Sequence, residues 1–156
     1  MARQSTGRGS KQDYGTPPEF LLAVKDRLGI KDFAIDLAAD SSNAVTNIYY
    51  GTEANSLAQD WHKINGWLWL NPPFTDITPW VRKAHEERIR GARIAVLVPL
   101  SFAEWWDYWV DDKAYVLMLA GRLQFVGATS SYPKECALLL YTPEGQRGYE
   151  LWRWKL

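Results

Sequence analysis

The chain has 156 residues, of which 47% are hydrophobic and 23% charged, and its 18 basic and 18 acidic side chains leave no net charge. This size and composition predict one soluble globular domain, and no apolar run approaches the roughly 18 residues of a membrane helix. The single cysteine excludes an internal disulfide, and zero net charge argues against a large basic footprint, although it permits a local one.

The N-terminal 13 residues are polar and predict a disordered basic tail, without the apolar segment of a signal peptide. The cations of this tail are Arg3, Arg8 and Lys11. We expect residues 14–156 to form one domain in the cytoplasm, without a separate domain for target recognition. Its first helix starts at Thr16-Pro17, with Thr16 as the predicted cap, and ends at Gly29.

The remaining elements follow from apolar runs and helical periodicity. Strands are expected at residues 33–38, 47–50, 67–70, 94–98, 115–119, 136–141 and 149–154. Helices are expected at 78–91, with Thr78 as the predicted cap, and at 102–109. Helices that alternate with short apolar strands predict an α/β fold with a mainly parallel sheet, and the late strands without a long helix between them predict an antiparallel C-terminal edge. Ligands of such folds bind beyond the carboxyl ends of the strands, where Asp36 and Asn71 are expected.

The strongest functional signal is Asn71-Pro72-Pro73-Phe74, directly after an apolar strand. An exocyclic amine such as adenine N6 is a poor nucleophile because its lone pair is delocalised into the ring. A site that methylates it needs acceptors for the amino hydrogens, and the Asn71 side-chain oxygen and the Pro72 carbonyl are suitable. The prolines restrict φ and hold both oxygens in place, while Phe74 offers a face for base stacking. A proline turn with Asn71 as a cap is the structural alternative.

Several segments in order resemble the phage-type DNA N-6-adenine methyltransferases, a compact Dam-like family. They are residues 14–20, 35–40, Tyr49-Tyr50, Asn55-Ser56-Leu57, Trp61, residues 71–74, Trp80-Val81, Val98-Pro99 and Gly121-Arg122-Leu123-x-Phe125. The resemblance implies a Rossmann-like fold, S-adenosylmethionine as methyl donor, double-stranded DNA as substrate, a flipped-out adenine, and the host cytoplasm as location if a phage encodes the chain.

The resemblance also implies which residues bind the cofactor. Thr16 and Pro17 are similar to the segment that closes over its methionine end, and Asp36, Ala38 and Asp40 to the first cofactor strand and turn. Asn55 stands where relatives often carry Asp beside the cofactor adenine. Two departures are the missing Gly-x-Gly after the first strand and Asn55 itself; Asp36 and Asp40 have turn or cap roles as alternatives. Glu53, the carboxylate after the second strand, is a candidate for the ribose hydroxyls, with a surface turn as its alternative.

Arg122, Arg8 and Lys11 are the candidate nucleic-acid contacts, and a salt bridge is the alternative for Arg122. The basic cluster at residues 82–93 is interpreted as a solvated helix face. We predict no metal, because no ligand spacing is recognised around His62 or His85. A catalytically idle DNA-binding module and a methyltransferase of RNA or protein glutamine remain alternatives. The oligomeric state and the target sequence are not predicted.

Overall fold

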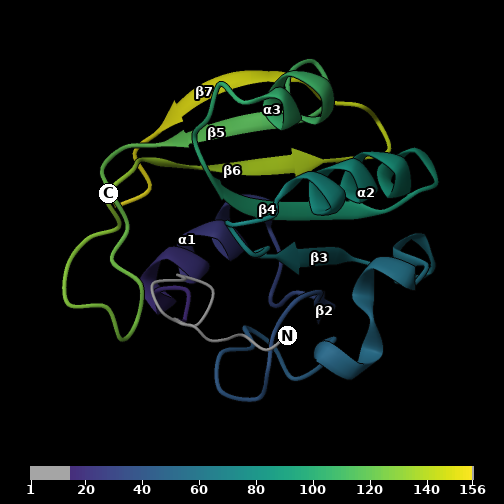
Figure 1. The fold of residues 1–156 in the computed structure, drawn as a ribbon, viewed down its shortest axis with the longest axis horizontal. Helices are drawn as coiled ribbons and strands as arrows, with labels where there is room; N and C mark the ends of the chain where they lie inside the picture. The colour runs from purple at the N-terminus through teal and green to yellow at the C-terminus, as the bar shows by residue number, and fades with distance from the viewer. Residues whose placement is uncertain (1–14, 156) are drawn as a thin grey trace.

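A six-stranded sheet in the order β2-β3-β4-β6-β5-β7 forms the centre of the computed structural model, which describes residues 15–155 (Figure 1). The strands are β2 (Ile35–Asp36), β3 (Trp67–Leu70), β4 (Arg93–Pro99), β5 (Tyr115–Leu119), β6 (Cys136–Tyr141) and β7 (Gly148–Trp152). The helices are α1 (Pro18–Leu28), α2 (Thr78–Ile89) and α3 (Glu104–Trp109), with 3-10 turns η2 (Thr52–Ala54), η3 (Ser56–Ala58) and η4 (Trp61–Lys63). The expected tail of residues 1–13 lies outside the described residues.

The strand directions confirm an α/β fold with a mostly parallel sheet. Strands β2, β3 and β4 run parallel, as do β5 and β7, whereas β6 is antiparallel to both β4 and β5. The expected antiparallel C-terminal edge is wrong, because β6 lies inside the sheet and the edge strand β7 is parallel to its neighbour. After β4, the chain passes through α3 to β5, which lies two positions away in the sheet. Residues 120–135 then lead back to β6, which lies between β4 and β5. All six β6 residues are buried, which requires neighbours on both sides.

Two hydrophobic clusters cover the two faces of the sheet. Helix α1 packs on one face through Phe20 and Val24, together with Trp69 and Trp154. Helices α2 and α3 and the Trp61 turn pack on the other face. Successive residues of β4 alternate between the clusters, as expected for a strand buried on both sides. None of the helices among residues 15–155 combines the length and apolarity that a membrane span requires.

Two predicted helix caps are wrong. Helix α1 begins at Pro18, and Pro17 is its N-cap residue without a side-chain cap bond. A proline disfavours helical ψ in the residue before it, so Pro18 keeps Pro17 at ψ 130° and Thr16 stands one residue too early to cap. At α2, Pro79 follows Thr78, which lies inside the first turn instead of capping it. The predicted end of α1 is confirmed, since Gly29 adopts φ 69°.

The first two predicted strands are shorter than expected. Strand β2 has two residues, and the run at 47–50 contributes only an isolated parallel bridge between Asp36 and Tyr49. The Asp36 N–H donates to the Ile48 carbonyl and the Tyr50 N–H to the Asp36 carbonyl, each at 2.9 Å. Ile48 and Tyr49 are exposed, so this outer segment lacks the burial that extends a strand. Strands β3, β5 and β6 have the predicted bounds.

Candidate active site

The carboxyl ends of three parallel strands meet at one edge of the sheet. Strand β2 ends at Asp36, and the next N–H, of Leu37, donates to the Trp69 carbonyl in β3 at 2.9 Å. Asn71 directly follows the end of β3, and β4 ends at Pro99 on the same side. The prediction that Asp36 and Asn71 lie at strand ends of a shared edge is therefore confirmed, and this edge is the ligand position of α/β sheets.

Asn71 lies half-buried at this edge, with Pro72 buried behind it. Its Oδ1 atom is inaccessible to solvent and has no hydrogen-bond partner among the described residues. An acceptor left unpaired in this way costs roughly 1–3 kcal/mol, and an unpaired polar atom in a folded protein calls for an explanation. The loop therefore presents an acceptor whose hydrogen bond the described part of the chain does not supply.

The Phe74 ring is half-buried and packs against the segment of residues 120–135. Its centroid lies 5.5 Å from that of Tyr132 and 6.4 Å from that of Phe125, with both pairs in edge-to-face geometry. Phe74 also contacts both hydrophobic clusters. The ring thus has a fixed position next to Asn71, supported by aromatic neighbours from another part of the chain.

Asp36 shapes the turn that follows β2. Its Oδ1 accepts the Ala38 N–H at 3.2 Å, and its Oδ2 accepts the Val45 N–H at 3.0 Å. The carboxyl is buried, and this burial raises its pKa to about 7 despite the two backbone donors. Both oxygens are occupied by the chain's own backbone, which corresponds to the turn role that the sequence left open.

Asp40 has a similar local role farther along the turn. Its Oδ1 accepts hydrogen bonds from the Ser42 N–H at 2.8 Å and from the Ser42 hydroxyl at 2.6 Å. Asp40 is exposed, and Ala38 lies half-buried between it and the strand end. These contacts are those of a side chain that closes a turn through its own backbone neighbours.

Glu53 and Asn55 lie beside the same turn. A methyl group placed on Gly51 would lie 3.6 Å from the Ala39 carbonyl oxygen and 3.9 Å from Glu53 Oε1. Gly51, Ala39 and Glu53 are therefore neighbours. Glu53 is exposed in η2. Asn55 has φ 50°, a left-handed conformation that asparagine tolerates better than most residues. The structure thus brings Ala38, Glu53 and Asn55 to one region.

The segment before α1 lies against residues 120–128. The Val126 N–H donates to the Gly15 carbonyl at 2.9 Å, and Thr16 and Pro17 are buried. A cavity of about 200 Å³ lies next to this contact. Its lining includes Pro17, Arg122, Trp154 and Lys155. The structure therefore places the Thr16–Pro17 start beside Arg122.

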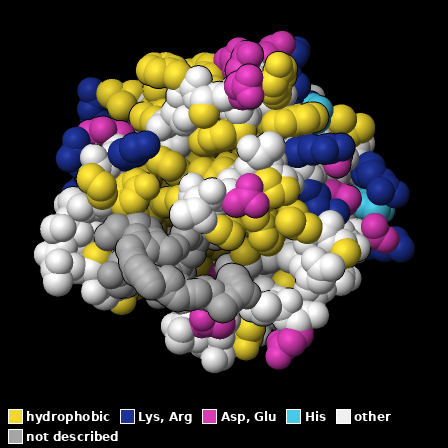
Figure 2. All heavy atoms as spheres, in the orientation of Figure 1, with side chains coloured by type: hydrophobic (Ala, Val, Ile, Leu, Met, Phe, Trp, Pro, Cys, Tyr) yellow, Lys and Arg dark blue, Asp and Glu magenta, His cyan; other side chains and the backbone are white. Residues whose placement is uncertain are grey.

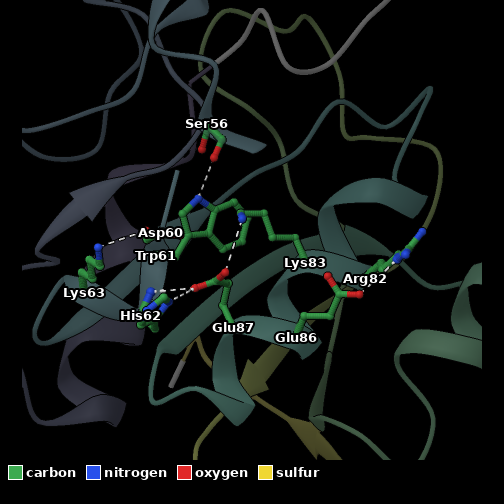
Figure 3. A network of polar contacts seen from close by, with 9 residues as sticks. All are labelled: Ser56, Asp60, Trp61, His62, Lys63, Arg82, Lys83, Glu86 and Glu87. Atoms are coloured by element: carbon green, nitrogen blue, oxygen red, sulfur yellow. Dashed lines mark hydrogen bonds and ion pairs between the residues drawn. The ribbon is translucent and has the colours of Figure 1, made fainter. Parts of the chain in front are cut away.

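A buried carboxylate that the sequence analysis missed connects α2 to η4 (Figure 3). Glu87 was expected on a solvated helix face, but it is 4% exposed. Its Oε1 accepts the His62 N–H at 2.8 Å and lies 2.7 Å from His62 Nδ1, while Lys83 Nζ lies 3.4 Å from Oε2. Burial by itself would raise the pKa of Glu87, but the bonds from His62 and the charge of Lys83 outweigh it and hold this pKa below its ordinary value. The i,i+4 spacing of Lys83 was visible in the sequence, whereas nothing there indicated His62.

The same network holds Trp61 between the helix and the η3 turn. Trp61 is fully buried, and its Nε1 donates to the Ser56 carbonyl at 2.9 Å. Its ring stacks on Trp80 with centroids 6.3 Å apart, and Lys83 Nζ lies 5.1 Å from its centroid. Ser56 directly follows Asn55, so the network positions the chain next to the candidate cofactor residues.

Ligand-type atoms of Asp60, His62 and Glu87 all lie within 4.8 Å of one another. The premise that no carboxylate accompanies His62 at ligand spacing is therefore wrong. Lys63 pairs with Asp60 at 3.2 Å and Lys83 with Glu87 at 3.4 Å, and these ammonium groups already balance both carboxylates. The group has the composition of an ion-pair network, and the absence of a metal remains a prediction.

The described cations are mostly paired. Arg122 Nε lies 3.2 Å from Glu135 Oε2, with both side chains exposed, which is the salt-bridge alternative for Arg122. On α2, Arg82 pairs with Glu86 at 3.2 Å (Figure 3). Figure 2 shows hydrophobic side chains across the middle of one face, with Lys and Arg towards its left and right margins. The other candidate contacts, Arg8 and Lys11, lie outside the described residues.

Comparison with known proteins adds independent evidence. A family model described as DNA N-6-adenine-methyltransferase (Dam) matches residues 4–141. A protein of Escherichia phage T1 named DNA N-6-adenine-methyltransferase is 33% identical over 93 residues, which are 60% of this chain and 38% of that relative. The aligned part thus spans well under half of the relative's length. No solved structure matches the chain.

Proposed function

This chain belongs to the DNA N-6-adenine-methyltransferase (Dam) family, and we propose that it methylates N6 of an adenine in double-stranded DNA. We also propose that residues 14–156 act as one Rossmann-like methyltransferase domain with S-adenosylmethionine as methyl donor. The α/β sheet, with its candidate residues gathered at the carboxyl edge of β2 and β3, supports this assignment.

The observation that carries the proposal is the unpaired Asn71 Oδ1. An adenine amino group donates two hydrogen bonds, and Asn71 Oδ1 and the Pro72 carbonyl are the proposed acceptors. As N6 forms its bond to the methyl carbon, positive charge develops on the nitrogen and both hydrogen bonds strengthen. The carbon–sulfur bond of the donor would break as this bond forms, with its electron pair remaining on sulfur, and N6 would release one proton to solvent, so that the methylated amine is uncharged.

The other loop residues orient the base. Pro72 and Pro73 restrict the backbone, and Phe74 is held by Tyr132 and Phe125 so that its ring can support the adenine. No protein nucleophile is required for direct transfer. Cys136 is buried in β6, and burial raises the pKa of its thiol to about 12, so it is not a competing nucleophile.

The residues around the β2 turn fit a cofactor only in part. When bound, S-adenosylmethionine supplies an activated methyl group on a sulfonium. Thr16, Pro17, Ala38, Asp40, Glu53 and Asn55 are the proposed contacts. Glu53 offers an exposed carboxylate suited to ribose hydroxyls, whereas both oxygens of Asp36 already bind backbone N–H groups. We therefore propose that Asp36 acts on the cofactor through the shape of its turn.

An adenine within a duplex cannot reach a loop of this kind while it is stacked. We infer that the enzyme extrudes the base from the helix before transfer, as enzymes that act on bases generally do. Arg122, with Arg8 and Lys11, is proposed to contact phosphates. Arg122 would exchange its exposed Glu135 partner for a phosphate, a low-cost change at a surface ion pair.

Labelling with tritiated S-adenosylmethionine tests the proposal. We expect label in unmethylated DNA and none in RNA or protein, and sequencing of the modified bases then defines the target site. Asn71→Ala is the matched control, because it should bind the cofactor in calorimetry but not label DNA. Label in RNA or protein glutamine instead of DNA would overturn the substrate assignment, and a wild-type chain that binds no cofactor would support the idle module.

A further inference from the structure

Phe102 is the most exposed of the large hydrophobic side chains in residues 15–155. It lies in the segment that leaves the carboxyl end of β4 and leads to α3 (Figure 1). Strands β3 and β4 are parallel neighbours, so this segment and the Asn71 loop leave the same edge of the sheet. A fully exposed aromatic ring thus stands on the edge that carries the proposed catalytic loop.

The backbone on both sides of Phe102 is anchored. Before it, the Leu100 N–H donates to the Glu135 carbonyl at 3.0 Å. After it, the Ala103 N–H donates to Ser101 Oγ at 2.9 Å, which closes a short turn around the residue. Trp106 in α3 is buried, and its Nε1 donates to the Tyr149 hydroxyl at 3.0 Å. The exposed ring is thus carried by a segment whose backbone is fixed on both sides by hydrogen bonds.

Two other aromatic side chains near this edge pack against neighbouring rings. Phe74 contacts Tyr132 and Phe125, and Trp105 lies edge-on to Trp106 at 5.6 Å. Phe102 makes no ring contact with another described residue. Phe102 is also the most exposed large hydrophobic side chain among the described residues. Its burial against a partner would therefore remove a large apolar area from water.

We propose that Phe102 inserts into the DNA base stack at the position vacated by the extruded adenine. This inference rests on the proposed function. Extrusion leaves a gap in which neighbouring bases lose their stacking partner, and an apolar wedge restores part of that contact. The exposed carboxylates Glu104 and Asp107 follow in α3, and their charge disfavours phosphates there. Phe102 is thus the part of this segment that offers DNA an apolar surface, whereas the carboxylates that follow it do not bind the DNA backbone.

The test uses duplexes that carry the target site defined by sequencing. One has the target adenine paired with thymine, and the other has it opposite an abasic position, where extrusion no longer breaks a base pair. Phe102→Ala should lower kcat/KM on the paired duplex by about tenfold to a hundredfold. The abasic duplex should recover most of that loss, and Phe102→Trp, which keeps a flat ring, should retain activity on both.

Several outcomes would overturn the proposal. Equal losses on both duplexes would assign Phe102 to general binding, and an unchanged kcat/KM would show that the ring does not enter the stack; in either case the wild-type activity leaves the proposed function intact. A wild-type chain that labels no DNA would overturn the proposed function and the wedge together. Thermal unfolding and cofactor calorimetry on Phe102→Ala should match wild type, because the side chain is fully exposed.

Discussion

The Asn71 amide oxygen and the Glu87 carboxylate are both withdrawn from water, yet their surroundings differ. Asn71 Oδ1 meets no donor among residues 15–155, whereas Glu87 accepts from His62 through one oxygen and pairs with Lys83 through the other. An unpaired buried acceptor lowers stability by roughly 1–3 kcal/mol, while a paired one holds its neighbours in place. Four other buried atoms, Ser56 Oγ, Trp69 Nε1, Arg88 Nε and Trp154 Nε1, also lack a partner among residues 15–155. The contrast therefore teaches that an unfilled acceptor indicates a ligand when it also lies at the carboxyl edge of the parallel strands, as Asn71 does.

Asn71→Ala should have the largest effect of these variants, and this effect should be on activity and not on stability. Turnover should fall at least about a hundredfold, because the lost acceptor matters most as charge develops on N6. The free energy of unfolding should stay within about 0.5 kcal/mol of wild type or rise, since the deleted Oδ1 atom has no hydrogen-bond partner among residues 15–155. Steady-state kinetics and thermal unfolding measure the two quantities. Retained turnover with reduced stability would reverse the interpretation of this residue.

Glu87→Ala should show the opposite pattern. Removing the buried carboxylate leaves the His62 N–H and Lys83 without their partner, and we expect the free energy of unfolding to fall by about 2–3 kcal/mol. Glu86→Ala is the matched control on the same helix, because its pair with Arg82 is exposed and should contribute less than about 0.5 kcal/mol. Denaturant titrations of both variants check this. Equal small changes would show that burial does not distinguish the two pairs.

Asp36 provides an intermediate case, a buried carboxyl bound by backbone N–H groups, with no pairing cation in the described part of the chain. Burial raises its pKa from 3.8 to about 7, so between these values the folded chain binds a proton that the unfolded chain lacks. Its contribution to stability should therefore decrease as pH rises through this window, by at most about 1.4 kcal/mol per pH unit.

Asp36→Asn should remove this slope. The variant also loses one acceptor, which lowers stability by an amount that does not vary with pH. The unfolding free energy of each protein is measured at intervals of about one pH unit, from about pH 4 to about pH 7. The two series give the difference in slope. Parallel curves would show that the Asp36 pKa is the same in the folded and unfolded chains.

Arg122→Ala should have the smallest effect. It tests whether Arg122 exchanges its Glu135 partner for a DNA phosphate. If Arg122 contacts a phosphate, the log–log salt dependence of duplex binding should flatten by about 0.9. Stability should change by less than about 0.5 kcal/mol because the Glu135 pair is exposed. Arg93→Ala is the control, since Arg93 pairs with Glu144 at the amino end of β4 and away from the proposed site. Equal slopes for the two variants would remove Arg122 from the DNA surface.

Local patterns predicted some parts of this fold well and others poorly. The runs at 67–70, 115–119 and 136–141 became strands with the predicted bounds, because burial of a strand on both faces leaves a continuous apolar run. The run at 47–50 became a single bridge at an exposed margin. The predicted caps at Thr16 and Thr78 are wrong because α1 begins one residue late, with Pro18 keeping Pro17 out of the helix, and α2 begins one residue early, at Thr78 itself.

The sequence by itself determined the α/β class, the position of Asn71-Pro72-Pro73-Phe74 at a strand end and the resemblance to a methyltransferase family, because each depends on local patterns and on their order along the chain. Only the tertiary structure decided that Glu87 meets His62 25 residues away, that β6 lies inside the sheet, and that Phe102 is fully exposed. These features depend on which distant segments pack together. A side chain's burial and partners are set by that packing, and the local pattern around Glu87 was equally compatible with a solvated helix face.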